Sequence, residues 1–178
     1  MNEKIIRNIY DFASILVSAV LAVCLIFTFV FKISAVDGDS MNNTLRNGNK
    51  VLITARDWTV ERGDIVVISQ PNAFNKVLIK RVIATEGQTV EINGKTHQVI
   101  VDGAVLDEPY IAEPVIVQGT WSYPVTVPEG CVFVMGDNRN NSLDSRSKTV
   151  GFIDTRYILG VAEFRFYPFG EWSLENYE

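Results

Sequence analysis

The chain of 178 residues contains one histidine and two cysteines, and these shortages exclude whole classes of site. Cys24 lies inside a long apolar run and Cys131 inside a predicted strand, so a disulfide or a cysteine-based zinc site is not expected. The lone histidine, His97, cannot build a multi-histidine metal site. It also has no nearby acid in a triad-like arrangement, so we interpret it as a solvated loop residue. We expect no metal and no cofactor.

Positive charge is also scarce, with 16 basic against 21 acidic side chains and a net charge of −5. A nucleic-acid-binding surface would be basic, so this class of partner is not expected. The sequence shows no internal repeat and no long amphipathic helix. Its length is sufficient for one packed domain once a membrane segment is set aside.

Residues 12–31 are uncharged and almost wholly apolar. As a helix that rises ~1.5 Å per residue, they would extend about 30 Å, which is the thickness of the hydrocarbon core of a bilayer. A cleavable signal peptide is the alternative, because Ser34 and Ala35 are small. The run is longer than a typical signal peptide core, and Ile33 stands where a second small residue would be needed. We favour a retained membrane anchor.

The charges beside this run predict its orientation. Lys4 and Arg7 precede it and only Lys32 follows closely, which favours a cytoplasmic amino terminus. The predicted organisation is a short cytoplasmic tail (1–11), a transmembrane anchor with its exit (12–36) and an extracytoplasmic domain (37–178).

The rest of the chain is rich in β-branched residues and in turn-forming residues, which predicts a mainly β, antiparallel domain. Asn93-Gly94 and Asp102-Gly103 are hairpin signals, and residues 85–128 are expected to form a hairpin-rich sub-lobe. The predicted strands are 51–54, 64–69, 76–84, 88–92, 99–101, 111–112, 115–117, 125–127 and 131–135.

Two residues are candidates for nucleophilic chemistry. Ser40 lies among turn-forming residues, where an exposed hydroxyl could act as a nucleophile if a base were in reach, although an ordinary turn serine is the simpler interpretation. Lys80 alternates with Leu78 and Val82 on one apolar strand face. Burial there would lower the pKa of its ammonium group, and the neutral amine could then act as a base, unless the side chain reaches solvent.

The polar segment 136–146 follows a hydrophobic strand and reads Gly-Asp-Asn-Arg-Asn-Asn-Ser-Leu-Asp-Ser-Arg. Its aspartates and asparagines can bond to backbone amides, which predicts a self-bonded platform. Asp144 with Arg146, or Asp137 with Arg139, could form ion pairs. A purely structural loop is the alternative.

Four motifs in this order resemble those of bacterial type I signal peptidases: Ser40-Met-Asn-Asn-Thr-Leu45, Gly63-Asp-Ile-Val66, Lys80-Arg-Val-Ile83 and the polar segment 136–146. The apolar anchor and the ending Phe164-Arg-Phe-Tyr-Pro-Phe169 are similar as well. The resemblance covers nearly the whole chain. It implies a membrane-anchored serine endopeptidase that removes signal peptides from secreted precursors.

The resemblance also implies roles for individual residues. Ser40 would be the nucleophile and Lys80 the general base, and Ser142 would orient the lysine amine. The Ser40 N–H would bind the oxyanion, and Gly38 stands where some relatives have a second donor. Supporting positions in the polar loop are Asp137, Asp144 and Arg146.

An apolar pocket for a small side chain, such as the alanine of an Ala-x-Ala site, is implied at Val36, Met41, Leu45, Leu78 and Ile79. The chain departs from the family pattern at Asn43, where proline is usual, so the turn after Ser40 could be less preorganised.

Two other functions remain alternatives. A self-cleaving repressor-type Ser-Lys peptidase would have a DNA-binding domain where this chain has its apolar run. A membrane-tethered binding domain would have no use for Ser40, Lys80 and Ser142 together. Expected partners are signal-peptide-bearing precursors and membrane lipid, the latter through the terminal aromatic residues. Of these we place Phe164 or Phe166 in the core and leave Trp172 open.

Overall fold

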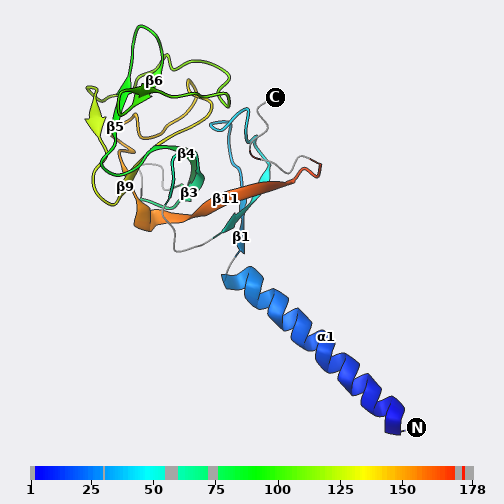
Figure 1. Cartoon of the computed structure of the whole chain (residues 1–178). Helices are drawn as coiled ribbons and strands as arrows, with labels where there is room; N and C mark the ends of the chain where they lie inside the picture. Colours follow the sequence, from blue (N-terminus) through cyan, green and yellow to red (C-terminus); the bar gives the residue numbers. More distant parts are fainter. Residues whose placement is uncertain (1–2, 30, 55–59, 72–75, 171–173, 175–178) are drawn as a thin grey trace.

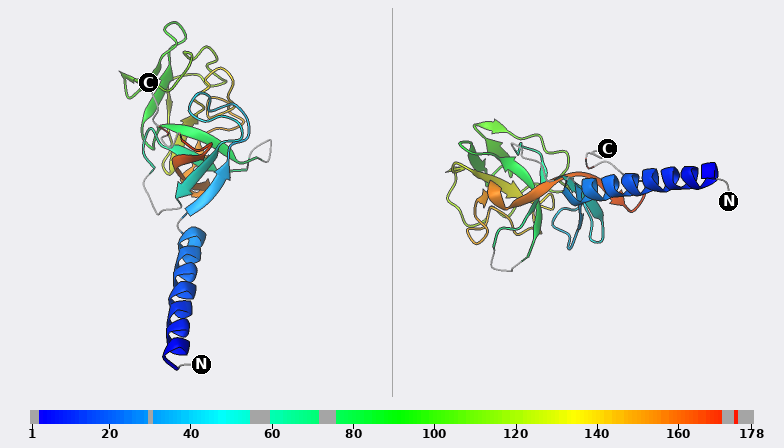
Figure 2. Two further views of the ribbon diagram at one scale, coloured as in Figure 1. Left: turned by 90° about the vertical axis from the view of Figure 1, so that its right-hand side faces the viewer. Right: turned by 90° about the horizontal axis from the view of Figure 1, so that it is seen from below.

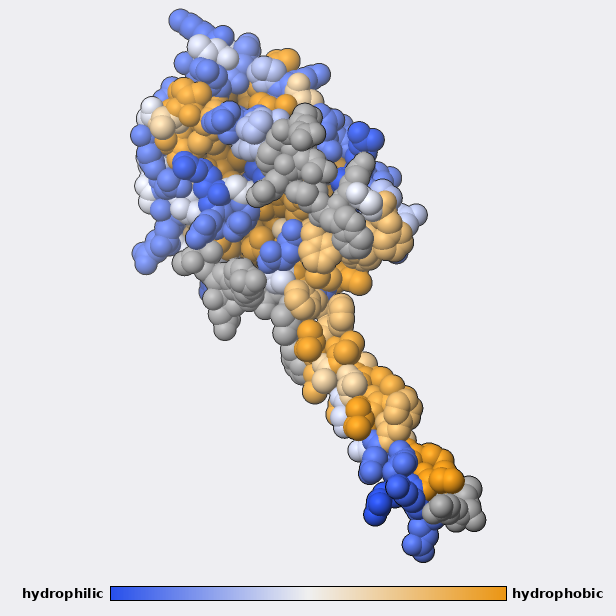
Figure 3. All heavy atoms as spheres, turned by 45° about the vertical axis from the view of Figure 1, so that its right-hand side comes forward, coloured by the Kyte–Doolittle hydropathy of each residue, from blue (hydrophilic) through white to orange (hydrophobic). Residues whose placement is uncertain are grey.

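In a computed structural model, which describes residues 3–29, 31–54, 60–71, 76–170 and 174, a single long helix projects from a β domain (Figures 1 and 2). Helix α1 (Glu3–Phe29) is exposed along its length, and it is the one helix of the described chain long and apolar enough to cross a membrane. Its surface is mostly apolar up to the domain (Figure 3). The helix is suited to lipid rather than to water.

The helix includes residues 3–11, which we expected as a cytoplasmic tail; a helix can continue past the bilayer, so this boundary of the anchor stays a prediction. Residues expected in the exit from the membrane form strand β1 (Phe31–Ala35), which pairs antiparallel with β2 (Lys50–Thr54). β1 is an edge strand, and this pairing satisfies the backbone groups on its inner side, so the chain enters the sheet almost directly from the helix.

The larger sheet is entirely antiparallel and has the strand order β1-β2-β11-β3-β4-β9-β10. This confirms the predicted mainly β, antiparallel fold. Strand β11, the last in sequence, lies between β2 and β3 and carries register shifts along its length. The remaining members are β3 (Ile65–Ile68), β4 (Leu78–Ala84), β9 (Cys131–Met135), β10 (Ile153–Asp154) and β11 (Ile158–Tyr167), with a short 3₁₀ helix, η1 (Thr155–Tyr157), before β11.

A second sheet of four strands falls within the predicted sub-lobe 85–128, with the order β7-β6-β5-β8. Its turn between β6 and β7 uses Asp102 and Gly103, both with positive φ, as a tight hairpin of right-handed twist requires. Its members are β5 (Thr89–Ile92), β6 (Val99–Val101), β7 (Ala104–Val105) and β8 (Val125–Thr126). His97 lies here, half-buried with its Nδ1 3.1 Å from the Val115 carbonyl oxygen, rather than fully solvated.

The strands predicted at 111–112 and 115–117 are absent from the structure. In the second stretch, side chains take backbone bonds that a neighbouring strand would make. The Ile116 N–H donates to Asn140 Oδ1 at 2.9 Å. The Val117 carbonyl accepts from Arg146 at 2.9 Å. This stretch is therefore tied to the polar loop 136–146 and not to a sheet.

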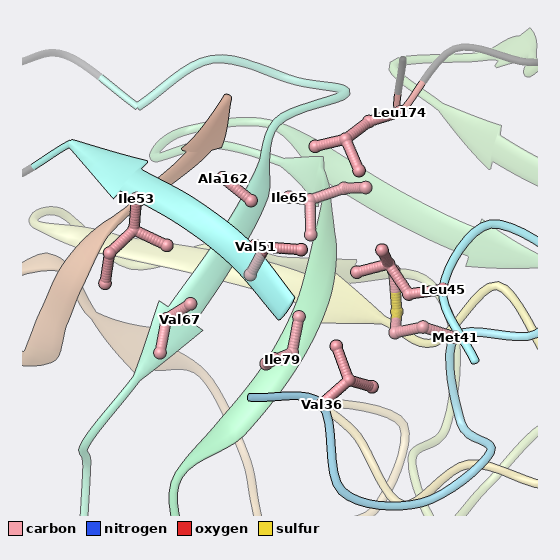
Figure 4. Close-up of a cluster of buried hydrophobic side chains, with 10 residues drawn as sticks. All are labelled: Val36, Met41, Leu45, Val51, Ile53, Ile65, Val67, Ile79, Ala162 and Leu174. Carbon is pink, nitrogen blue, oxygen red and sulfur yellow. The ribbon is translucent and has the colours of Figure 1, made fainter. Parts of the chain in front are cut away.

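The core beneath the candidate nucleophile is an apolar cluster between the loop after β1 and strands β2, β3, β4 and β11 (Figure 4). Met41 and Leu45, on either side of a short turn, are almost completely buried in it. Their burial fixes the segment that carries Ser40 against the sheet. At the far end of β11, Phe164 and Phe166 are half-buried and Phe169 is exposed, while Trp172 lies outside the described residues.

Candidate active site

Ser40 is held by the loop between β1 and β2. This loop closes through two backbone bonds, from Val36 N–H to the Asn49 carbonyl and from Gly48 N–H to the Val36 carbonyl, each 2.9 Å long. Gly38 has a φ of +97°, a conformation that other residues rarely adopt, and its N–H donates to Asn47 Oδ1. The chain can therefore turn sharply just before Ser40.

Lys80 lies in β4 beneath this loop and is only 3% exposed. Its Nζ is 2.7 Å from Ser40 Oγ and donates to the Ile79 carbonyl at 2.8 Å. The structure therefore brings together the two residues that the sequence singled out, within hydrogen-bond distance and with the lysine buried as expected.

The environment of Lys80 favours its neutral form. Burial lowers the pKa of its ammonium group from 10.5 to about 8; the carboxylates of Asp144 and Asp137 oppose this shift, and Arg146 assists it. Near physiological pH the neutral amine is then a minor form, but far more abundant than for an exposed lysine. A neutral amine in contact with a hydroxyl can accept its proton, so the pair can generate a nucleophile without a histidine.

The polar loop 136–146 lies against the Ser40 loop. The Asp144 carboxylate accepts from Arg146 Nε and Nη2 at 2.8 Å and from the Gly136 N–H at 2.9 Å, so this predicted pair is present. Its fully buried carboxylate thus holds both ends of the loop together. A Cβ at Gly136 would lie 2.3 Å from the Ser40 carbonyl oxygen, so only glycine fits at this approach.

The alternative pairing of Asp137 with Arg139 is wrong. Asp137 instead accepts two bonds from Arg81, at 2.8 and 2.9 Å, and a third from the Thr44 hydroxyl. Arg139 pairs with Glu108 of the sub-lobe at 2.7 Å. Arg81 and Arg139 thus each pair with a carboxylate from a distant part of the chain, and Arg139 does not pair with its neighbour Asp137.

Ser142, which the resemblance implies as the residue that orients the lysine amine, makes no hydrogen bond to Lys80 in the described part of the chain. Its Oγ is buried but has no hydrogen-bond partner among the described residues, and the Lys80 amine is held by Ser40 and the Ile79 carbonyl instead. Ser142 Oγ packs where a side chain at Gly136 would project. It lies in the same loop as the platform residues, so its role in orienting the amine stays a prediction.

A groove of about 520 Å³ runs past the Ser40–Lys80 pair. Four of the predicted pocket residues line it, namely Val36, Met41, Leu78 and Ile79. Leu45 does not line it, because its side chain is fully buried in the cluster behind Met41. The groove is thus apolar next to the nucleophile, with Asp37 and Lys76 forming an ion pair of 3.7 Å at its exposed rim.

Sequence reasoning missed several residues that build the site. Arg81 anchors Asp137 and lies over the Tyr110 ring, 4.0 Å from its centroid. Asn138 bonds twice to the Ser40 segment, through its backbone N–H and its side-chain amide. An arginine next to a buried lysine was a weak signal for Arg81, whereas nothing local distinguishes Asn138 from other asparagines of the loop.

Comparison with known proteins gives consistent matches over most of the chain. A family model described as signal peptidase, peptidase S26, matches residues 9–167. Signal peptidase I S of Bacillus subtilis (strain 168) is 38% identical, covering 96% of this chain and 95% of the relative. Probable signal peptidase I-1 of Synechocystis sp. is 40% identical, covering 89% and 82%. A crystal structure of a signal peptidase I from Enterococcus faecalis V583 is 31% identical, with a TM-score of 0.46, and covers 58% of this chain and 97% of that one.

Proposed function

Because this chain belongs to the signal peptidase family, peptidase S26, we propose that it is a membrane-anchored serine endopeptidase that removes signal peptides from secreted precursors with a Ser40–Lys80 dyad. The observation that carries the dyad is the 2.7 Å contact between Lys80 Nζ and Ser40 Oγ in a buried setting. The apolar groove beside the pair supports a peptide substrate with small side chains.

In the proposed reaction, the neutral Lys80 amine takes the proton of Ser40 Oγ as that oxygen adds to the scissile carbonyl carbon. The Ser40 N–H stabilises the negative oxygen of the tetrahedral intermediate. Collapse expels the amine of the mature protein, which receives the proton from Lys80, and leaves an ester on Ser40. Lys80 then deprotonates a water molecule, which hydrolyses the ester, releases the signal peptide with a carboxyl end and restores Ser40 Oγ–H.

The anchor gives this reaction its location. We propose a single span with the amino terminus in the cytoplasm, supported by Lys4 and Arg7 before the apolar run. Strand β1 follows the helix directly, so Ser40 stays within a few residues of the membrane surface. A precursor anchored by its own signal segment would present its cleavage site in the same plane, which raises the effective concentration of each partner.

The exposed aromatic residues at the end of β11 and just beyond it supply a second proposed contact with the membrane. Tyr167 and Phe169 are 48% and 76% exposed, and their rings pack against each other 6.1 Å apart. Amphipathic aromatic rings favour the membrane–water interface, so we propose that they rest against lipid headgroups.

Cleavage of a series of peptides tests the proposed specificity. Purified full-length protein in detergent should cut a precursor peptide after Ala-x-Ala and cut the matching peptide with valine before the scissile bond at least about tenfold more slowly, because sterics in an apolar pocket discriminate by this order. In Leu78→Ala, the widened groove should reduce that preference by about tenfold. Ratios of kcat/KM are the measurement.

Val105→Ala, an exposed change in the sub-lobe, is the control and should keep the wild-type ratio. A Leu78→Ala protein with an unchanged ratio would show that this wall does not select the side chain. No cleavage of either peptide by folded wild-type protein would argue against the proposed function itself.

A further inference from the structure

Asn138 holds both peptide groups that flank the candidate nucleophile. Its side-chain Nδ2 donates to the Asp39 carbonyl oxygen at 3.0 Å, and its backbone N–H donates to the Ser40 carbonyl oxygen at 3.0 Å. A residue nearly one hundred positions later in the chain thus contacts two consecutive carbonyls of the Ser40 loop.

The first of these bonds fixes the direction of the oxyanion donor. A peptide group is planar, so the Asp39 carbonyl and the Ser40 N–H belong to one rigid unit and point in opposite directions. A bond that holds the carbonyl therefore also holds the N–H. The same carbonyl also accepts from the Asn42 N–H at 3.1 Å within its own turn, and the Asn138 bond ties this turn to the polar loop 136–146.

The loop that carries Asn138 is itself well anchored. The Asn141 N–H donates to the Asn138 carbonyl at 3.0 Å, and the neighbouring Asp137 is fully buried with two bonds from Arg81. Gly136 allows the loop to approach the Ser40 carbonyl closely. The amide of Asn138 is consequently presented from a rigid support.

We propose that Asn138 is a positioning residue that orients the Ser40 N–H as the oxyanion donor. The inference rests on the proposed function, because it concerns the same reaction. The side-chain bond of Asn138 does not contact substrate in this account. It acts through the Asp39–Ser40 peptide plane, and it matters most in the tetrahedral intermediate, when negative charge develops on the substrate oxygen.

The test compares Asn138→Ala and the isosteric Asn138→Asp with wild type in the full-length protein. Both lose the Nδ2 donor. Because removal of an oxyanion donor costs about 10²–10³-fold in kcat, a misdirected donor should cost about 10–100-fold, with KM changed less than about threefold. Rates are taken at alkaline pH, above the titration of Lys80, because an added carboxylate would raise the pKa of that amine.

A second measurement separates this role from a structural one. Ser40 Oγ can add to the carbonyl carbon of a peptide aldehyde with the Ala-x-Ala sequence, which places negative charge on the aldehyde oxygen as in the tetrahedral intermediate. The corresponding peptide alcohol has no carbonyl group and cannot undergo this addition. Both variants should bind the aldehyde more weakly by about the factor lost in kcat and bind the alcohol as wild type does. A general distortion of the groove would weaken both ligands together.

Asn141→Ala is the matched control, since Asn141 is an asparagine of the same loop with an exposed side chain; it should retain wild-type kcat and aldehyde affinity. Wild-type kcat and aldehyde affinity in either folded Asn138 variant would overturn the inference. Should Asn138→Ala not fold, Asn138→Asp alone decides. If wild type cleaves and the variants match it, only this inference fails; if folded wild type cleaves nothing, the proposed function fails.

Discussion

Replacing either member of the Ser40–Lys80 pair is expected to lower kcat by at least about 10⁴-fold, because neither group can act without the other. Ser40→Ala removes the nucleophile, and Lys80→Met removes the amine while filling its buried site with an apolar side chain of similar length. Since the two act as a unit, the double variant should be no slower than either single one. Single-turnover cleavage of an Ala-x-Ala precursor peptide is the measurement.

Folding should survive both changes, which makes the loss interpretable. Lys80 is buried largely among apolar strands, and burial of its charge already disfavours the ammonium form. Circular dichroism and thermal unfolding of each variant should resemble wild type. Lys95→Met, a lysine on the exposed surface of the sub-lobe, serves as the control with normal turnover. A folded Lys80→Met protein that cleaves at the wild-type rate would refute the dyad.

The second large effect is expected on stability. Asp137 is fully buried and neutralises the guanidinium of Arg81 while also holding Thr44. Asp137→Ala removes the carboxylate that accepts from both Arg81 and Thr44 in a buried setting, which should reduce the free energy of unfolding by about 3–5 kcal/mol. Urea unfolding of the full-length protein in detergent, followed by the fluorescence of the β domain, gives this value.

The ion pair of Asp154 with Arg156 offers a contrast on the surface. The Arg156 side chain is 84% exposed, so solvent screens the pair. Arg156→Ala removes the pair but keeps the Asp154 carboxylate that caps η1, so it should leave the unfolding midpoint close to that of wild type. An Asp137→Ala protein as stable as Arg156→Ala would mean that the buried pair does not support the loop around Ser40.

Much of this site could be predicted from the sequence, but the strength of the sequence signal differs from residue to residue. Alternation along β4 indicated a buried Lys80, since strand periodicity is a local property that two neighbours suffice to reveal. Ser40 in isolation resembled any turn serine, and only the order of surrounding motifs distinguished it. The pairing of Asp144 with Arg146 was accessible because the two residues are close in sequence.

The errors concern contacts between distant parts of the chain. Arg81 and Asp137 are 56 positions apart, so a local interpretation paired Asp137 with Arg139 instead. The strand expected at 115–117 was wrong because its apolar residues suit a strand, while polar side chains of another loop take the backbone bonds of Ile116 and Val117. The start of the helix was not predicted, because composition marks where apolar residues lie and not where helical hydrogen bonds begin.

The most direct test of the proposed mechanism is the pH dependence of kcat/KM for an Ala-x-Ala precursor peptide. The reactive form of Lys80 is the neutral amine, so protonation below its pKa removes activity and deprotonation above it restores activity. With that pKa lowered to about 8, the rate should be small in acid, half-maximal near pH 8 and constant at higher pH. A rate that stays constant from acid to alkaline pH in the folded protein would contradict a titrating lysine base.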